Sequence, residues 1–564
     1  MALAFLIHLA VSTLVAIVLG LAFGRINANI AVVSLLLGTL AGVWVWRSLK
    51  DEGSLFPDIK FTQVLLYGFI LFAGLQHFLY LLYYDRHALK TLHANNFGDL
   101  TMHIQYIRSI AHGSQFWPYN PGFAGDLLRY PIGMDLYNAL LETLGVPTDS
   151  HLFLVGIIMT LAAVSMLHRW MGWLGVGAFF LNGGLANWQC LREERLYDFQ
   201  NTVAWKNFFL SLWITQRGFL FAIPAGVYVI KMMTETILGE RHLSRYEKIV
   251  CIVLWSALAW FHLHTFFILS LTLGISILLY RRFRLLLEIV LPVAAAGCIF
   301  VWFSTDGLSR AKILHTQWGW VAGEENLLKF WFMNLGPWLL LSFAGIFLVL
   351  KKSYAHLRPF AVVFVLLFFL FTWLMVAPWD WDNTKVLIWL YLLIVWISWR
   401  TWVKHLSPVF AFLTGCILFF SGTLAVVSSL PGNSQGVQLY KAEELWESKS
   451  ALMDLPKDAV LAIVPDPNHP AMFWGANVAM GYPGHLWAHA IDYGERERRL
   501  ERIFKGESNW FTLAKDIGIT HIYWGANEKR KYDAFNPSLQ YQLKNISRSQ
   551  TIKVFEVQSI RSYQ

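Results

Sequence analysis

Long apolar runs alternate with short polar loops along most of the chain. A membrane-spanning helix needs about 20 mainly apolar residues, and the chain contains repeated runs of nearly that length. They lie near residues 3–23, 30–46, 62–83, 151–167, 172–187, 216–235, 249–261, 265–280, 287–303, 330–350, 360–376, 386–399 and 409–430. The pattern predicts a polytopic α-helical membrane protein, with about 13 transmembrane helices in residues 1–430. The first run is interpreted as a retained helix, because no basic stretch precedes it.

The stretch 249–280 is long enough for one helix or for two. Basic loops flank it on both sides, at 241–248 and 281–284. If both loops are cytoplasmic, the stretch crosses twice and turns at the polar segment 261–265. With that choice, the basic loops share one side of the membrane throughout. The opposite, non-cytoplasmic side receives the loop at 84–150, which we expect to carry interfacial helices, and the whole C-terminal tail.

The composition changes abruptly after residue 430. Residues 459–464, 521–524 and 551–557 have the pattern of strands, and residues 495–504 and 511–517 have that of helices. Strands that alternate with helices indicate a small α/β domain. We therefore expect a soluble C-terminal α/β domain at 431–564 on the non-cytoplasmic side.

The overall composition agrees with a membrane protein and excludes several other classes. Of the 564 residues, 56% are hydrophobic and only 14% are charged, against about 25% charged residues in an average soluble domain. The net charge of +9 comes from basic residues in short loops, so it gives no reason to expect nucleic acid as a partner. The four cysteines are far apart and have no metal or redox spacing.

The loop at 84–150 carries the first candidate for catalysis. Asp99 and His103 are four residues apart at the start of a predicted helix, so they share one face. A carboxylate supported by an imidazole could deprotonate an acceptor hydroxyl. Asp is also a favoured helix N-cap, and the two roles do not exclude each other.

Further polar residues fall in the same predicted layer of the molecule. Arg129 follows a Pro-rich aromatic segment that could stack on a sugar or anchor the loop at the membrane interface. Arg217 could clamp a phosphate or extend to the membrane surface. His262 and His264 flank the predicted turn, where they could contact phosphate or a metal or be structural.

Two more segments complete the set of candidate binding residues. Asp380, Asp382, Asn383 and Lys385 lie within six residues at a helix entrance, where unpaired charges are costly. They could orient sugar hydroxyls, hold a divalent cation or bind phosphate, or they could cap the helix with an exposed ion pair. In the tail, His485, Asp492 and Tyr493 lie in a Gly/Pro-rich aromatic stretch typical of carbohydrate binding or of packing on a membrane domain.

These features together resemble the GT-C glycosyltransferases, including the protein mannosyltransferases and aminoarabinose transferases. The resemblance lies in the early acidic loop at 98–99, about a dozen spans and the C-terminal domain on the same side. Segments 261–265, 379–385, 484–487 and 492–497 are similar to uncharacterised bacterial members. In two respects the chain differs from the family pattern. The acidic loop follows the third run rather than the first, and Leu100, not a second acidic residue, follows Asp99.

The resemblance implies a bacterial inner-membrane enzyme whose active site faces the periplasm or exterior. A polyprenyl-phosphate-sugar would be the donor, and a glycan, lipid or protein hydroxyl would be the acceptor, with Asp99 as the general base. The metal ligands stay unknown, and a cation such as Mg²⁺ or Mn²⁺ could assist the leaving phosphate. Two other classes stay open, a flippase or transporter of lipid-linked glycans and a non-catalytic subunit of envelope assembly.

Overall fold

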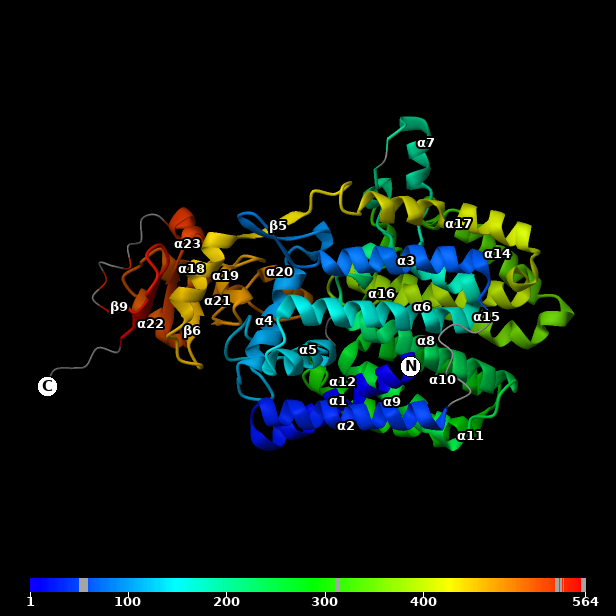
Figure 1. Ribbon diagram of the computed structural model, residues 1–564, viewed down its shortest axis with the longest axis horizontal. Coiled ribbons are helices and arrows are strands. Elements are labelled where there is room, and N and C mark those ends of the chain that lie inside the picture. The colour runs from blue at the N-terminus through cyan, green and yellow to red at the C-terminus, as the bar shows by residue number, and fades with distance from the viewer. Residues whose placement is uncertain are drawn as a thin grey trace.

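The computed structural model describes residues 1–49, 59–195, 197–309, 314–532, 537, 540 and 542–558. Long helices gather in a bundle at one end of the molecule, and short helices and strands of the C-terminal region form the other end (Figure 1). Three helices, α4 (Asp99–Ala111), α5 (Gly133–Thr143) and α20 (Pro483–Ala488), lie between the two parts (Figure 1).

Within the described residues, eight helices are long and apolar enough to cross a membrane. They are α1 (Ala2–Phe23), α2 (Ala28–Ser48), α6 (Thr148–Phe180), α8 (Arg217–Leu238), α12 (Leu291–Ser304) with the turns before it, α15 (Arg358–Trp373), α16 (Asp380–Thr401) and α17 (Pro408–Ser428). A ninth span would be formed by α13 (Leu327–Leu335) and α14 (Pro337–Val349), which meet at 103°. Shorter helices, α3 (Phe61–Leu79), α9 (Arg245–Phe261) and α10 (Leu263–Leu279), occupy three further predicted runs. The molecule is thus a polytopic helical protein with fewer full-length spans than the sequence pattern predicted.

The runs predicted at 151–167 and 172–187 lie in one kinked element, α6, which is helical on both sides of the kink and ends at Phe180. The only break inside α6 is at Met171 and Gly172, where Gly172 has φ 58° and ψ −145°. A Cβ atom at Gly172 would lie 2.8 Å from the Trp399 ring, so glycine permits both the bend and the contact.

The stretch 249–280, by contrast, divides into two helices as predicted. His262 is extended, with φ −160° and ψ 94°, and ends α9 while it begins α10. Its side chain bonds the Thr265 backbone N–H and hydroxyl, at 3.2 and 2.8 Å, which satisfies the first turn of α10. The helix can therefore break within segment 261–265, because the His262 side chain bonds a backbone N–H at the start of α10 that has no helical partner.

The C-terminal region is built on a five-stranded sheet of order β7-β6-β8-β10-β9. Its strands are β6 (Val460–Ala462), β7 (Asn477–Val478), β8 (His521–Trp524), β9 (Leu543–Asn545) and β10 (Lys553–Val557). Strands β7, β6 and β8 are parallel, and β10 is antiparallel to β8 and β9. The accompanying helices are α18 (Ala442–Leu452), α19 (Pro470–Phe473), α21 (Gly494–Phe504), α22 (Trp510–Asp516) and α23 (Ala526–Lys531). Three strands and two helices thus confirm the predicted alternation.

The predicted outer loop and the C-terminal region share a second sheet. The hairpin of β1 (Tyr83–Asp85) and β2 (Ala88–Thr91) pairs with β5 (Val437–Lys441), with Leu89 opposite Tyr440. The remaining short elements are α7 (Cys190–Glu193), α11 (Phe283–Leu285), and the paired strands β3 (His315–Thr316) and β4 (Leu374–Met375).

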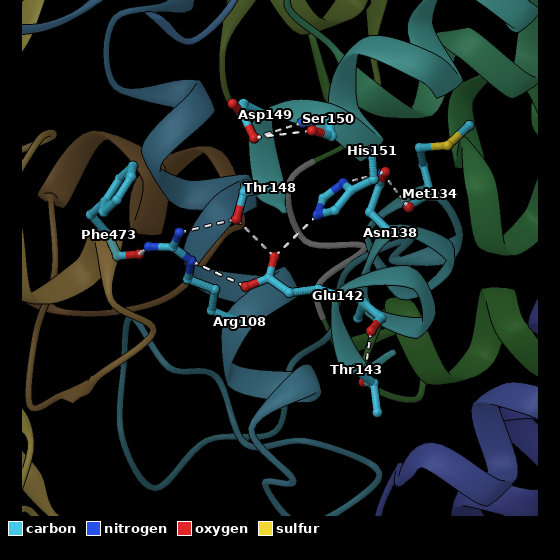
Figure 2. A network of polar contacts seen from close by, with 11 residues as sticks. Arg108, Met134, Asn138, Glu142, Thr143, Thr148, Asp149, Ser150, His151 and Phe473 are labelled. Atoms are coloured by element: carbon cyan, nitrogen blue, oxygen red, sulfur yellow. Dashed lines mark hydrogen bonds and ion pairs between the residues drawn. The ribbon is translucent and has the colours of Figure 1, made fainter. Parts of the chain in front are cut away.

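A polar network joins the loop helices to the C-terminal region (Figure 2). Arg108 on α4 donates hydrogen bonds to the Phe473 carbonyl at 2.7 Å, to Glu142 at 3.2 Å and to Thr148 at 3.0 Å. Glu142 also pairs with His151 at 3.1 Å. Because charges far from water are stabilised only when every donor finds a partner, this network holds α4, α5, α6 and α19 in one arrangement.

Candidate active site

Asp99 is the first residue of α4, and its carboxylate is not used as a helix cap. Gly98 occupies the cap position with φ 88°, and the carboxylate accepts no backbone N–H within the described chain. The side chain keeps 36% of its exposure, and Oδ1 lies 3.5 Å from Nε2 of His485. Of the two predicted roles, the cap is therefore not realised, and the carboxylate is left accessible to a ligand.

The neighbouring C-terminal segment approaches Asp99 because of Gly98. A Cβ atom at Gly98 would lie 3.1 Å from Pro467 and 3.8 Å from His485 Nε2. The Gly98 backbone N–H donates to Asn468 Oδ1 at 3.2 Å, and the Thr101 hydroxyl donates to the same oxygen at 2.7 Å. The His485 imidazole and the Asp99 carboxylate thus lie next to each other, because Gly98 allows the close approach and the Asn468 side chain holds the two segments together.

The charges around Asp99 keep its carboxylate ionised. Burial among protein atoms pushes the pKa of Asp99 upward, but the His485 hydrogen bond and charge, with smaller effects from His103 and Lys385, bring it below its ordinary value. Lys385 is on α16, so the first loop and the helix entrance at 380–385 meet at one site. The carboxylate is therefore negative at neutral pH and faces three cationic or imidazole groups.

His103 is oriented by a carboxylate that the sequence analysis did not select. Its Nδ1 lies 2.9 and 3.0 Å from the two carboxylate oxygens of Asp135, and both side chains are buried. Its Nε2 has no hydrogen-bond partner in the described residues. His103 therefore influences Asp99 through its charge, while Asp135 determines its tautomer and orientation.

Tyr130 lies among the acidic groups of this site. Its ring centroid is 6.1 Å from that of His103 and 4.9 Å from that of His489. Burial raises the pKa of Tyr130 well above its usual value, and the charges of Asp135, Asp99 and Asp382 raise it further. The phenol therefore stays protonated and can donate a hydrogen bond. Neither Tyr130 nor His489 was among the predicted binding residues. Tyr130 lies in an aromatic segment that could also anchor the loop at the membrane interface.

In the segment 376–385, at the start of α16, some polar side chains hold the local structure and others are charged groups that could act on a ligand. The Asn383 amide accepts from the N–H groups of Val376 and Ala377 and donates to the carbonyls of Ala377 and Trp379, so it holds the turn. Asp382 and Lys385 form an ion pair of 2.6 Å at the start of α16.

The charged residues beside Asn383 differ in which other residues their charges influence. Asp380 is exposed at the first position of α16. Lys385 lies close enough for its charge to act on Asp99, His262 and His264. The charges of both Lys385 and Asp382 thus reach the site, since Asp382 acts on His264 and Tyr130.

Arg217 is a buried cation whose guanidinium has no hydrogen-bond partner among the described residues. It begins α8, is 1% exposed, and none of its three guanidinium nitrogens has a partner in the described residues. The charge of Asp135 reaches it, but no ion pair forms. A buried guanidinium is normally paired with an anion, so its surroundings are incomplete without one.

His262 presents a second unpartnered donor or acceptor next to Arg217. Its Nδ1 is bound to Thr265, whereas its buried Nε2 has no hydrogen-bond partner in the part of the chain that the structure describes. A Cβ atom on Gly218 would be 2.4 Å from the Phe261 carbonyl and 3.3 Å from the His262 ring, so glycine lets α8 approach the break between α9 and α10. The His262 and His264 ring centroids are 5.7 Å apart.

Other predicted binding residues have different surroundings. Arg129 pairs with Asp306 at 2.7 Å and donates to the Phe303 carbonyl at 3.0 Å, so it ties the loop to the end of α12. Asp492 is exposed, and Tyr493 precedes α21 and packs against the hydrophobic core of the C-terminal region. Among the described residues, no hydrogen bond or ion pair joins Asp492 or Tyr493 to Asp99.

The donor set does not fit a resident divalent cation. The described ranges contain no group of three His, Cys, Asp or Glu side chains arranged to hold a metal. Oxygen ligands are the ones Mg²⁺ and Mn²⁺ prefer, yet Asp382 is paired with Lys385 and Asp99 with His485.

Comparison with known proteins adds no relative. No family model matches the chain, and no curated protein matches its sequence.

Proposed function

We propose that this protein is an integral-membrane glycosyltransferase of the GT-C type. It moves a sugar from a polyprenyl-phosphate donor to an acceptor hydroxyl on a glycan, lipid or protein, at the non-cytoplasmic face of a bacterial inner membrane. The observation that carries the proposal is the accessible, uncapped Asp99 carboxylate within reach of Lys385 and the imidazoles, beside a layer that contains the unpartnered Arg217. Base and anion-binding groups are both needed for this reaction.

Asp99 acts as the general base in this proposal. The acceptor oxygen attacks the anomeric carbon, and its proton becomes strongly acidic as the new C–O bond forms. Because the acceptor proton is already strongly acidic when it is transferred, a carboxylate with a lowered pKa is basic enough to accept it. The lowered pKa also keeps the Asp99 carboxylate ionised before the reaction begins. A single displacement inverts the anomeric configuration.

The leaving phosphate gains negative charge as the glycosidic bond breaks. Preorganised cations at that position stabilise the transition state more than the ground state. Lys385, Arg217 and His262 are the groups assigned to it, and the last two have buried nitrogen atoms without partners. Tyr130 and His485 would orient the acceptor or sugar hydroxyls around Asp99.

The experiment is a transfer assay with the purified protein in nanodiscs. Polyprenyl-phosphate hexoses and pentoses, labelled in the sugar, are supplied with acceptors extracted from the same membranes, and labelled product and free polyprenyl phosphate are measured. Asp99→Asn should lower transfer by about 100-fold or more without lowering the unfolding temperature.

Asp149→Asn is the matched control, because Asp149 is also in the first turn of a helix but is exposed. It should retain normal transfer. Equal transfer by wild type and Asp99→Asn would overturn the proposal. ATP- or gradient-dependent movement of intact lipid-linked sugar, with no transfer, would indicate a flippase.

A further inference from the structure

Helix α4 has polar side chains on two opposite faces, and one face holds the fold together. Thr101, Gln105 and Arg108 are three or four residues apart, so they lie on the same side of the helix. They donate hydrogen bonds of 2.7, 2.8 and 2.7 Å to one side chain and two backbone carbonyls of segment 468–476. This face therefore attaches α4 to the C-terminal region.

Asp99 and His103 lie on the other face, one helical turn apart. Asp99 Oδ1 lies 3.5 Å from His485 Nε2, and Asp99 Oδ2 has no hydrogen-bond partner among the described residues. His103 uses Nδ1 for its bond to Asp135, and its Nε2 has no partner in the same part of the chain. This face thus presents two neighbouring atoms that can form hydrogen bonds and that the described protein does not use.

The imidazole of His103 is held in a fixed orientation before any ligand binds. His103 is 3% exposed, and its Nδ1 lies 2.9 and 3.0 Å from the two carboxylate oxygens of Asp135. A buried polar atom without a partner costs stability unless a ligand supplies one. A side chain that is already ordered loses little freedom when a ligand binds to it. Both properties are those of a binding group.

Two neighbouring hydrogen-bonding atoms match two hydroxyls of one molecule. A hydroxyl both donates and accepts, so it can pair with a carboxylate and with an imidazole in either protonation state. Hydroxyls on neighbouring carbons of a sugar ring form such a pair, whereas a serine or threonine side chain or a simple lipid alcohol has a single hydroxyl. A single hydroxyl on Asp99 would leave His103 Nε2 unpaired, and an unpaired buried group lowers affinity strongly.

We propose that Asp99 and His103 bind two neighbouring hydroxyls of one sugar ring, so that the acceptor is a glycan. The inference rests on the proposed glycosyl transfer. One hydroxyl gives its proton to Asp99 as its oxygen bonds the anomeric carbon, and the donor phosphate leaves with the electron pair of the broken C–O bond. The second hydroxyl bonds His103 Nε2 and keeps its proton. Asp135 is a positioning residue, because it acts through the imidazole.

The first test uses the full-length protein in nanodiscs with acceptor extracts that have been oxidised by periodate. Periodate cleaves the carbon–carbon bond between neighbouring hydroxyls, and borohydride then reduces the aldehydes that form. The comparison extract receives periodate already quenched with glycerol and the same borohydride. Transfer by wild type should fall about 10-fold or more in the oxidised extract only. Undiminished transfer there would overturn the inference and leave the proposed function intact, whereas no transfer to either extract would overturn both.

The second test separates the ligand contact of His103 from its bond to Asp135. An Asn side chain places its amide near the position of Nδ1 and can still bond Asp135, whereas a Gln side chain places its amide near Nε2. His103→Asn should therefore lower kcat/KM for the extracted acceptor about 10- to 100-fold, and His103→Gln should retain more of it. Transfer of the sugar to water, measured with the acceptor omitted, should be unchanged in His103→Asn, because water has no second hydroxyl.

His151→Asn is the matched control, because His151 is also a buried histidine whose ring is bonded to a carboxylate, Glu142, at 3.1 Å. It should leave the ratio of glycan transfer to water transfer equal to that of wild type. If His103→Asn lowers both transfers by the same factor, or if His103→Gln loses as much as His103→Asn, His103 is a structural residue and the inference is wrong.

Discussion

Two buried polar clusters, one around Arg108 on α4 and one around Arg217 on α8, differ in how completely their charges are satisfied. Around Arg108, every group shown in Figure 2 has a partner, and the guanidinium also stacks 4.3 Å from the Phe473 ring. Around Arg217, the guanidinium and the His262 Nε2 have none within the described residues. A complete network stabilises a fold, whereas an incomplete one loses stability unless a ligand completes it. The difference separates a structural cluster from a binding site more clearly than residue type does, because both contain Arg, His and a carboxylate.

The first way to break this comparison is Arg108→Gln. It leaves Glu142 partly buried with a single cationic or imidazole partner, and it removes the bond to the Phe473 carbonyl. Loss of one member of a buried ion pair costs about 3–5 kcal/mol, so the unfolding temperature in detergent should fall strongly. Turnover per folded molecule should stay within about threefold of wild type, because the network touches no proposed reacting group. A large loss of turnover with normal stability would contradict the structural assignment.

Arg217→Gln is the complementary change and has the opposite expected sign on stability. Removing an uncompensated buried charge should leave the unfolding temperature equal or raise it. Affinity for polyprenyl phosphate should fall about 10- to 100-fold, since a hydrogen bond to a charged group contributes about 1.5–3 kcal/mol. Thermal shift with and without polyprenyl phosphate measures both quantities. A destabilised variant with unchanged affinity would show that Arg217 is a structural residue.

The sequence predicted the local features of this site better than its long-range pairs. The break at 261–265 could be predicted because a polar segment falls between two basic loops, and its cap is local, since His262 bonds Thr265 three residues on. The strand 521–524 could be predicted because the pattern that indicates it lies entirely within those four consecutive residues. Asp135 was not selected, since its partner His103 is 32 residues away and no local spacing marks the pair.

The structure shows contacts of two predicted binding residues that no local pattern marks. Asn383 was expected either to orient a sugar hydroxyl or to help cap the helix, and its amide bonds the turn at 376–379. Arg129 was expected near the substrate, but Asp306, at the far end of another helix, binds it. The two runs predicted at 151–167 and 172–187 meet at the kink of α6, where Met171 and Gly172 leave helical geometry.

Acid should lower the stability that the cluster around Arg108 contributes, because it protonates Glu142. Burial raises the pKa of Glu142, but His151, Arg108 and Thr148 lower it more, so the folded pKa lies below the ordinary value of 4.5. A carboxyl with a lowered folded pKa stabilises the protein fully above its unfolded pKa, and this stability is lost as the pH falls through the folded value. The unfolding temperature of wild type should therefore drop below about pH 4.5. Glu142→Gln should show a shallower drop over the same range, and identical slopes would contradict this account.

The smallest expected effect is that of Tyr440→Phe. This change tests whether the junction near Asp99 is only structural, like the cluster around Arg108, or also supports the binding site. The Tyr440 hydroxyl lies 2.6 Å from Thr101 Oγ1, which in turn donates to Asn468. If the junction only holds the C-terminal region, the change costs about 1 kcal/mol of stability and turnover stays within about threefold. If it also positions Gly98 and Asp99 against His485, turnover should fall further than stability, because a misplacement of about 1 Å can cost 100-fold in rate. Transfer rate and unfolding temperature measured on one preparation distinguish the two outcomes. We expect the first, since Asn468 keeps its bonds to both Gly98 and Thr101 when the hydroxyl is removed.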